Sequence, residues 1–329
     1  MTIIPIFIPH AGCPHQCVFC NQRAISGQQV AAVEAAAQQI ARWRQWVRPV
    51  ATNEAAFYGG SFTGLPMELQ RQLLSLTDEL LAEGVIGSVR LSTRPDYIDA
   101  ARLDLLAEHG VRLVELGVQS MDDAVLAAAE RGHTAAQVAE AMALLQQRGF
   151  KTGIQLMVGM PRQTFASVQQ TVAQVIRLRP DIARIYPLLV IKNTPLEKMY
   201  NAGQFTPLTL DEAVEQSAYV YKHLTEAGIK VIRIGLQPDD ELCANGNIVA
   251  GSFHPSMGEL VKSYLIRQQV ERDLQRCKHK AVIQFAPQME SKVRGLKNSN
   301  TQYWQEQFPQ LEIILEKSNV QHMQVLTDV

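Results

Sequence analysis

The feature that most limits the fold of this 329-residue chain is a repeated alternation of short apolar runs with longer amphipathic stretches. Short apolar runs between turn residues are typical of strands, and apolar residues spaced three and four apart are typical of helices. We predict strands at 3–8, 54–58, 88–91, 112–116, 153–158, 182–186 and 231–234, and helices at 29–46, 67–82, 98–108, 134–148, 165–178 and 210–227. Strand-then-helix units in this order predict a parallel sheet.

The number of these units indicates an open structure. A complete eight-unit barrel needs one more clear unit, so we expect an α/β fold with a partial (β/α) barrel over residues 1–235. After Gly235 the pattern changes to a predicted helix at 256–276 and apolar runs at 281–285, 311–315 and 323–326. Residues 236–329 are therefore expected to form a small C-terminal α+β appendage that binds substrate or acts as a lid.

Composition excludes several other classes of protein. Hydrophobic residues make up 47% of the chain and charged residues 19%, with a net charge of −1, which argues against disordered and fibrous proteins. No apolar run approaches the roughly 20 residues of a membrane span. The N-terminus lacks the basic region and cleavage site of a signal peptide. We expect a cytoplasmic protein without membrane contact.

Three of the five cysteines form a C-x3-C-x2-C cluster, Cys13, Cys17 and Cys20, directly after the first predicted strand. An odd number of clustered thiols does not make a disulfide framework. Soft thiolates at this spacing favour one compact iron–sulfur cluster. A cubane normally takes four cysteines, and Cys243 and Cys277 lack comparable spacing. One iron is therefore expected to keep an open coordination position.

Two other interpretations of these thiols remain at this stage. A structural zinc ion completed by His10 or His15 is one, and three buried thiols without a ligand role are the other. The segment is rich in proline, glycine and histidine rather than apolar. This composition favours a metal cluster over inert packing.

The cysteine pattern, with Phe19 before its last cysteine, resembles the signature of the radical S-adenosylmethionine (SAM) superfamily, and the resemblance extends over about residues 3–234. It implies an oxygen-sensitive [4Fe–4S] cluster held by Cys13, Cys17 and Cys20, with SAM at the open iron. It also implies an external electron donor, a ferredoxin or flavodoxin, because the sequence contains no second cluster motif.

Two segments resemble the family's SAM-binding motifs at strand ends. Y-G-G-S at 58–61 is similar to the GGE-type motif, which implies that Gly59, Gly60 and Ser61 contact the methionine amino group. Two glycines permit close approach of the backbone to a ligand. S-T-R-P-D at 92–96 resembles the E-T-R-P-D segment of the Elongator catalytic subunit, with Ser92 in the place of glutamate.

Two further segments imply contacts to SAM. L-G-V-Q-S at 116–120 is similar to oxygen-independent coproporphyrinogen oxidases and implies that Gln119 and the following Arg131 bind the SAM carboxylate. A guanidinium fork suits a carboxylate. Q-L-M-V-G-M-P at 155–161 resembles D-L-I-x-G-L-P and implies that Gln155 contacts the ribose. Two alternatives without a ligand remain. Arg131 could be a solvated residue at a helix end, and Gln119 could be an ordinary strand terminus.

The run at 184–196 resembles the Elongator-like branch, and we expect the chain to lack that subunit's acetyltransferase domain. The implied function is reductive cleavage of SAM to a 5′-deoxyadenosyl radical for modification of RNA, specifically tRNA. Residues 262–297 contain nine Lys and Arg against three Asp and Glu, a basic segment that suits RNA. A radical SAM enzyme acting on a small molecule or protein, and a non-catalytic metal-cluster module that binds RNA, are the alternatives.

Overall fold

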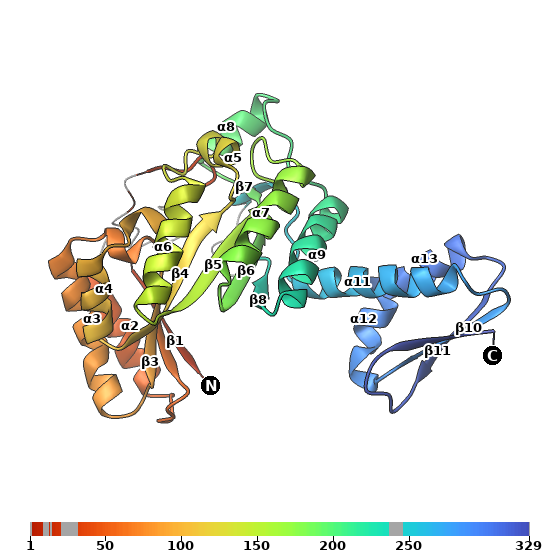
Figure 1. Ribbon diagram of the computed structural model, residues 1–329, viewed down its shortest axis with the longest axis horizontal. Coiled ribbons are helices and arrows are strands. Elements are labelled where there is room, and N and C mark those ends of the chain that lie inside the picture. Colours follow the sequence, from red (N-terminus) through yellow and green to blue (C-terminus); the bar gives the residue numbers. More distant parts are fainter. Residues whose placement is uncertain (1, 9–12, 14, 21–31, 237–245, 329) are drawn as a thin grey trace.

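The computed structural model describes residues 2–8, 13, 15–20, 32–236 and 246–328. Its largest element is a parallel sheet of seven strands in the order β1-β2-β3-β4-β5-β6-β8, curled into a half-barrel (Figure 1). All seven predicted strands belong to it. They are β1 (Ile3–Phe7), β2 (Glu54–Tyr58), β3 (Ser88–Thr93), β4 (Val111–Gln119), β5 (Lys151–Val158), β6 (Ile182–Pro187) and β8 (Lys230–Ile234). The expected partial barrel is confirmed.

Helices between the strands cover one side of the sheet (Figure 1). They are α2 (Ala32–Arg44), α3 (Met67–Ala82), α4 (Ala100–Glu108), α6 (Ala135–Gln147), α7 (Phe165–Leu178) and α9 (Leu210–Glu226). The short helices α5 (Asp123–Ala128) and α8 (Pro195–Asn201) lie instead at one end of the half-barrel. Polar residues fix several starts: Thr134 and Thr209 both form capping boxes, with Gln137 and Glu212. The main core lies between these helices and the strands and is built mostly from Ile, Leu and Val, with some Ala, Phe and Met.

A two-stranded antiparallel ribbon, which we did not predict, stands at the end of the barrel. It consists of β7 (Leu189–Ile191) and β9 (Ile248–Gly251). Residues 248–251 follow the barrel in sequence, so this pairing joins the predicted appendage to the predicted core. Leu188 and Val190 on one side of the ribbon belong to a small apolar cluster with Val18 of the cysteine segment.

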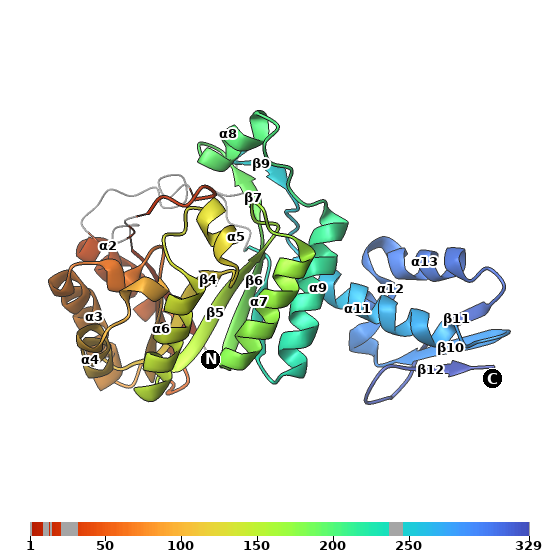
Figure 2. The same ribbon diagram turned by 45° about the horizontal axis from the view of Figure 1, so that its top comes forward.

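The C-terminal unit is built around a three-stranded sheet in the order β11-β10-β12, from β10 (Lys280–Phe285), β11 (Glu312–Lys317) and β12 (Gln324–Thr327). Helices α11 (Met257–Leu274), α12 (Glu290–Arg294) and α13 (Ser299–Gln307) accompany it, and Trp304 is fully buried in its separate core. Figure 2 shows α11 running from the barrel to this unit. Its first turns pack against α9 through Met257 and Val261, and the division at residue 235 stays a prediction.

Inside the half-barrel, a buried carboxylate ties three strands together. Glu115 of β4 is 1% exposed in its side chain and bonds to Arg90 of β3 and to Arg184 of β6, the latter at 2.5 Å from Nε to Oε2. Arg90 also pairs with Glu54 at 3.1 Å. Burial opposes ionisation of Glu115, but the two guanidinium groups hold its pKa below its usual value. Gly153 of β5 has no side chain, and this leaves the space that the Glu115 side chain fills.

We predict that Gly153→Ala destabilises the fold. A Cβ atom at this position would lie 2.7 Å from Glu115 Cγ and 3.0 Å from Ile182 Cγ1. Displacing the carboxylate from its two arginines and overpacking the sheet should lower the free energy of unfolding by about 1–3 kcal/mol, measured by urea denaturation.

Gly258→Ala is the matched control, because its Cβ would meet only Ile234 atoms at 3.8 Å within helix α11. That variant should be as stable as the wild type or more stable by about 0.4–1 kcal/mol. Equal unfolding midpoints for the two variants would contradict the role given to Gly153.

Candidate active site at the carboxyl edge of the sheet

The carboxyl ends of parallel strands meet at one edge, and the cysteine segment lies at this edge. Its described part is anchored by two backbone bonds of Val18: its N–H donates to Ala129 O at 3.2 Å, and its carbonyl accepts from Leu196 N at 2.7 Å. Cys17 is buried, whereas Cys13 and Cys20 are partly exposed, and none of the described cysteines forms a disulfide. The segment is therefore held between α5 and α8.

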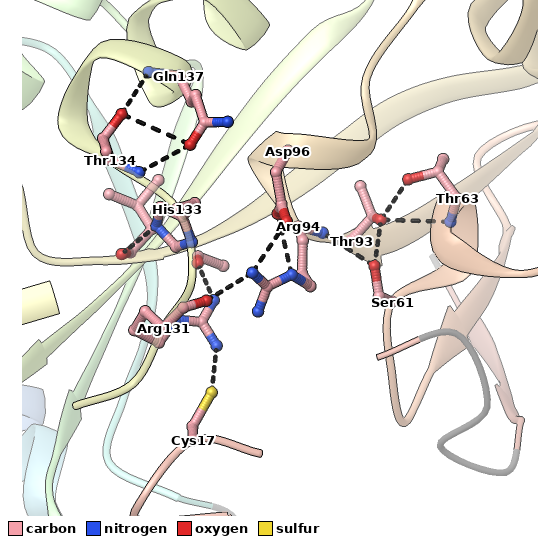
Figure 3. Close-up of polar contacts among 12 residues, drawn as sticks. Cys17, Ser61, Thr63, Thr93, Arg94, Asp96, Arg131, His133, Thr134 and Gln137 are labelled. Carbon is pink, nitrogen blue, oxygen red and sulfur yellow. Dashed lines mark hydrogen bonds and ion pairs between the residues drawn. The ribbon is translucent and has the colours of Figure 1, made fainter. Parts of the chain in front are cut away.

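Arg131 joins the cysteine segment to the sheet. It follows α5 and is 6% exposed. Nη1 donates to Cys17 Sγ at 3.1 Å, and Nη2 donates to the Gly117 carbonyl at 2.5 Å (Figure 3). Its Nε has no hydrogen-bond partner although it is buried. This environment excludes the solvated helix-end arginine considered above.

A second buried arginine, Arg94, lies directly behind the first. It directly follows β3, donates from Nη2 to the Arg131 carbonyl at 2.5 Å, and forms a fork with Asp96 at 2.9 and 3.0 Å (Figure 3). Burial opposes its charge, but Asp96 and the nearby Cys13 and Cys17 thiols raise its pKa. Arg94 Nη1 is buried without a partner. Arg94 and Asp96 lay in the S-T-R-P-D motif but were not among the predicted site residues.

The turn after β2 depends on glycine and on hydroxyl groups. Gly59 has φ +96°, and a Cβ there would lie 2.7 Å from the Ile8 carbonyl oxygen. The Ser61 hydroxyl contacts Thr93 Oγ1 at 3.1 Å and accepts from Arg94 N at 3.3 Å, and Thr63 also bonds to Thr93 (Figure 3). The Ser61 side chain is therefore engaged in shaping the turn, while the backbone of Gly59 and Gly60 remains as the predicted ligand contact.

The remaining predicted contacts form two pairs on the inner face of the sheet. Gln119, in the left-handed region at φ +68°, ends β4 and has a buried Oε1 without a partner. A Cβ on Gly117 would lie 3.1 Å from Gln119 Nε2 and 3.3 Å from Arg131 Nη2, so these two side chains meet above that glycine. Gln155 donates to Ser92 Oγ at 3.3 Å. The structure thus places Ser92 beside Gln155, and Gln119 beside Arg131.

The cysteine thiols are chemically suited to hold an iron–sulfur cluster, and the polar groups around them are suited to bind SAM. Cys17 accepts a hydrogen bond from Arg131, and Cys13 and Cys17 lie near Arg94. The partnerless N–H and carbonyl atoms of Arg131, Arg94 and Gln119 match the carboxylate and ammonium groups of an amino acid. Within the described ranges, no three His, Cys, Asp or Glu side chains are gathered closely enough to hold a metal ion. Each of Cys13, Cys17 and Cys20 as a ligand stays a prediction.

His133 was also not among the predicted site residues, and its ring lies close to the two arginines (Figure 3). It is 4% exposed; its Nε2 lies 3.3 Å from the Val118 carbonyl, while Nδ1 has no partner. Burial, together with the charges of Arg131 and Arg94, lowers its pKa from 6.5 to about 3. The ring is therefore neutral in the folded protein at any pH near 7.

We predict that His133 makes the protein less stable in mild acid. In the unfolded chain the ring titrates near pH 6.5, so below this pH the unfolded state binds a proton that the folded state accepts only near pH 3. The contribution is fully present above pH 6.5 and is lost as the pH falls toward 3. Between pH 7 and pH 5 the wild type should lose about 2 kcal/mol more than His133→Gln, measured by urea unfolding.

The exposed His279 provides the control for this experiment. His279→Gln should keep the pH dependence of the wild type. If His133→Gln shows the same loss of stability as the wild type between pH 7 and pH 5, the buried neutral state of this ring is wrong.

The chain as a whole is similar to several known proteins. The tRNA uridine(34) acetyltransferase of Methanocaldococcus infernus is 26% identical over 319 residues, which cover 84% of this chain and 59% of that relative. The solved structure of Elp3 from the same archaeon, with an N-terminal deletion, superposes with a TM-score of 0.64 at 24% identity, over 84% of this chain and 64% of that one. Coproporphyrinogen III oxidase (HemN) of Escherichia coli superposes at 0.50 with 21% identity, over 69% and 52%.

These similarities agree with the resemblance drawn from the motifs, and the chain spans about three fifths of the acetyltransferase relative. Two family models also match. The Radical SAM superfamily model covers residues 7–175, and the Radical SAM C-terminal domain model covers residues 180–267. The superfamily uses a [4Fe–4S] cluster and SAM. In the part of the chain that the structure describes, no helix is long and apolar enough to cross a membrane. The chain is an enzyme and belongs to the radical SAM superfamily.

Proposed function

We propose that this enzyme cleaves SAM reductively and uses the resulting radical to modify tRNA in the cytoplasm, with a ferredoxin or flavodoxin as electron donor. The observation that carries the proposal is the pair of buried arginines behind Cys17, each with one N–H group that lacks a partner. A buried donor without a partner costs about 1–3 kcal/mol, so such groups call for a ligand.

In this proposal the two arginines and a glutamine bind the amino-acid end of SAM. Arg131 is oriented by Gly117 and Cys17, and Arg94 by Asp96, so the free Nε and Nη1 positions are fixed before a carboxylate arrives. The partnerless Gln119 oxygen is an acceptor for the ammonium group, a role that differs from the carboxylate contact expected from the motif. Preorganised donors lose little side-chain freedom on binding, which raises affinity.

The cysteine segment and the glycine turn have the remaining roles. Cys13, Cys17 and Cys20 would hold the cluster, which together with SAM supplies a 5′-deoxyadenosyl radical that abstracts hydrogen from an unreactive carbon. The backbone of Gly59 and Gly60 would accept the amino group at close approach. Ser92 and Gln155, joined by a hydrogen bond on the inner face, would contact the ribose. The half-barrel then excludes water from the reacting atoms.

The proposal of a tRNA substrate is supported by the acetyltransferase relative and by the basic segment 262–297. The structure reduces the number of cations in this segment that could contact RNA. Lys280, Lys292 and Arg294 pair with glutamates at 3.8, 3.9 and 3.0 Å, and Arg267 stacks between two tyrosines. Within residues 262–297, the exposed cations that have no ion pair with another described residue are Arg272, Arg276, Lys278 and Lys297. Arg272 lies in the last turn of α11, and Arg276 and Lys278 come directly after the helix.

We predict that the anaerobically reconstituted protein, treated with SAM and dithionite, forms 5′-deoxyadenosine. Cys17→Ala should lose both the cluster absorbance and the product, because it removes a ligand and the acceptor of the Arg131 bond. Cys277→Ala is the control: its thiol is buried in the C-terminal unit and donates to the Lys280 carbonyl at 3.1 Å. It should keep both signals. A wild-type protein that carries a cluster but never forms 5′-deoxyadenosine would refute the proposed chemistry.

We predict that the triple variant Arg272→Gln, Arg276→Gln, Lys278→Gln weakens tRNA binding. Each lost phosphate contact should reduce the slope of log K against log salt concentration by nearly one, so the slope should fall by about two to three. Filter binding at several salt concentrations measures this slope. The matched control neutralises the paired cations as Lys280→Gln, Lys292→Gln, Arg294→Gln and should change it less.

The alternative of a small-molecule or protein substrate makes the opposite prediction for this pair of variants. Equal slopes for both triple variants and the wild type, with 5′-deoxyadenosine formation intact, would favour it. The non-catalytic RNA-binding module loses its support because the chain belongs to an enzyme superfamily.

A further inference from the structure

Within the C-terminal unit, two short helices are inserted between two parallel strands. Strand β10 is followed by α12 and α13 and then by β11, which runs parallel to β10. Ile283 and Phe285 of β10 pack with Val293 of α12 and Trp304 of α13 in a core separate from that of the barrel. The unit is thus a β-α-α-β fold whose two helices are joined by a tight loop, residues 295–298.

This loop has the sequence G-L-K-N and a left-handed backbone at three of its four residues. The φ angles are +75° at Gly295, +53° at Lys297 and +62° at Asn298. Left-handed residues other than glycine are uncommon, and asparagine is among those that adopt this conformation most readily. Glycine is needed at 295, because a Cβ atom there would lie 2.9 Å from the backbone nitrogen of Asn300. The sequence of the loop therefore suits a tight turn between the helices.

The loop is held in this shape from inside the unit. The Asn300 side chain is 3% exposed, and its Nδ2 lies 3.0 Å from the Ser263 carbonyl of α11 and 3.1 Å from the Val293 carbonyl of α12. Val293 and Trp304, on either side of the loop in sequence, are both fully buried. A loop that is already ordered loses little conformational freedom when it binds a ligand.

The tip of the loop is exposed and has unused hydrogen-bonding groups. Leu296 is 51% exposed, and Lys297 is exposed as well. Within the described part of the chain, Lys297 forms no ion pair, and the backbone N–H groups of Leu296 and Lys297 donate to no other residue. A nucleotide has both chemical features that fit this tip. Its phosphate matches the cation and the N–H groups, and its sugar and base match the apolar side chain.

The charge beside the loop is positive. Arg294 and Lys317 share one carboxylate, Glu290, at 3.0 and 2.7 Å. Lys297 adds a further charge that no described carboxylate pairs with. This excess of positive charge favours a polyanion such as the phosphate backbone of RNA.

The loop is separate from the basic residues at the end of α11. Ser263, which lies beside the loop through Asn300, and Arg272 are on the same helix, about 14 Å apart along its axis. The two regions can therefore contact different parts of one RNA.

We propose that the loop 295–298 clamps the backbone of a single-stranded segment of RNA. Lys297 and the two N–H groups would bind a phosphate, and Leu296 would pack against the adjacent sugar or base. KH domains bind RNA through a G-x-x-G loop that clamps about four nucleotides of the backbone. Here Asn298 stands in the place of the second glycine and is left-handed. The proposal rests on the proposed function only in that the bound RNA would be the substrate.

The test measures binding of the full-length reconstituted protein to a fluorescein-labelled RNA of about 12 nucleotides that cannot fold on itself, by fluorescence anisotropy. The variant Leu296→Asp, Lys297→Asp should raise the Kd about tenfold, because two carboxylates would then face the phosphates. Lys297→Gln should raise the Kd about threefold and reduce the magnitude of the slope of log K against log salt concentration by about 0.7. Lys297→Gln decides the question if the double variant does not fold.

Leu210→Asp, Lys151→Asp is the matched control, because it makes the same two substitutions at exposed positions of the barrel. It should change the Kd by less than about twofold. Urea unfolding midpoints are compared with the wild type, so that a loss of binding is read only from folded variants.

Three results would overturn the clamp: a wild type that does not bind the single strand, loop variants that bind as tightly as the control, or a duplex of the same length that competes as well as the unlabelled single strand. Equal competition by polyglutamate would also overturn it and would assign the loop to an acidic protein partner.

Formation of 5′-deoxyadenosine is measured on the same samples and separates this proposal from the proposed function. The loop variants should keep it. A protein that binds RNA through the loop but forms no 5′-deoxyadenosine rejects the proposed chemistry and keeps the clamp. RNA binding that the loop variants do not change, with 5′-deoxyadenosine formed, rejects the clamp alone.

Discussion

The ionised Glu115 inside the half-barrel is the interaction on which the rest of the sheet depends. A buried carboxylate is costly unless it is paired and hydrogen-bonded, and here it bonds to Arg90 on one side and Arg184 on the other. The three residues come from β3, β4 and β6, so their geometry is met only when these strands are in the observed register. This register also fixes how the motifs at the ends of these strands lie relative to one another.

Arg184 also links the charge network around Glu115 to the glycine turn after β2. Its guanidinium lies 5.8 Å from the centre of the Tyr58 ring, and Tyr58 immediately precedes Gly59. A cation over an aromatic face is attracted by the ring and restricts its position. The charge network within the barrel and the backbone that approaches the ligand are thus joined by one contact. This explains why a polar interior is kept where apolar side chains would pack more simply.

Sequence patterns predict the barrel strands well because each is a short apolar run between clear turn residues. The β7–β9 ribbon was missed because its strands are short and pair across a long separation, which local periodicity does not reveal. The motifs indicated Gly59, Gln119 and Arg131. The arrangement of Arg94 on the Arg131 carbonyl and the burial of His133 depend on strand register, and no local pattern predicts them.

Counting charges along the sequence does not predict which cations are available to bind RNA, because it also ignores contacts made in space. The segment 262–297 is basic in sequence, yet Glu259, Glu290 and Glu312 approach its cations in space, two of them from outside the segment. Pairs of this kind contribute little to stability, but they reduce the field available to a phosphate. Binding strength should therefore follow the exposed cations that lack a carboxylate, and the end of α11, with Arg272, Arg276 and Lys278, is where those cations concentrate.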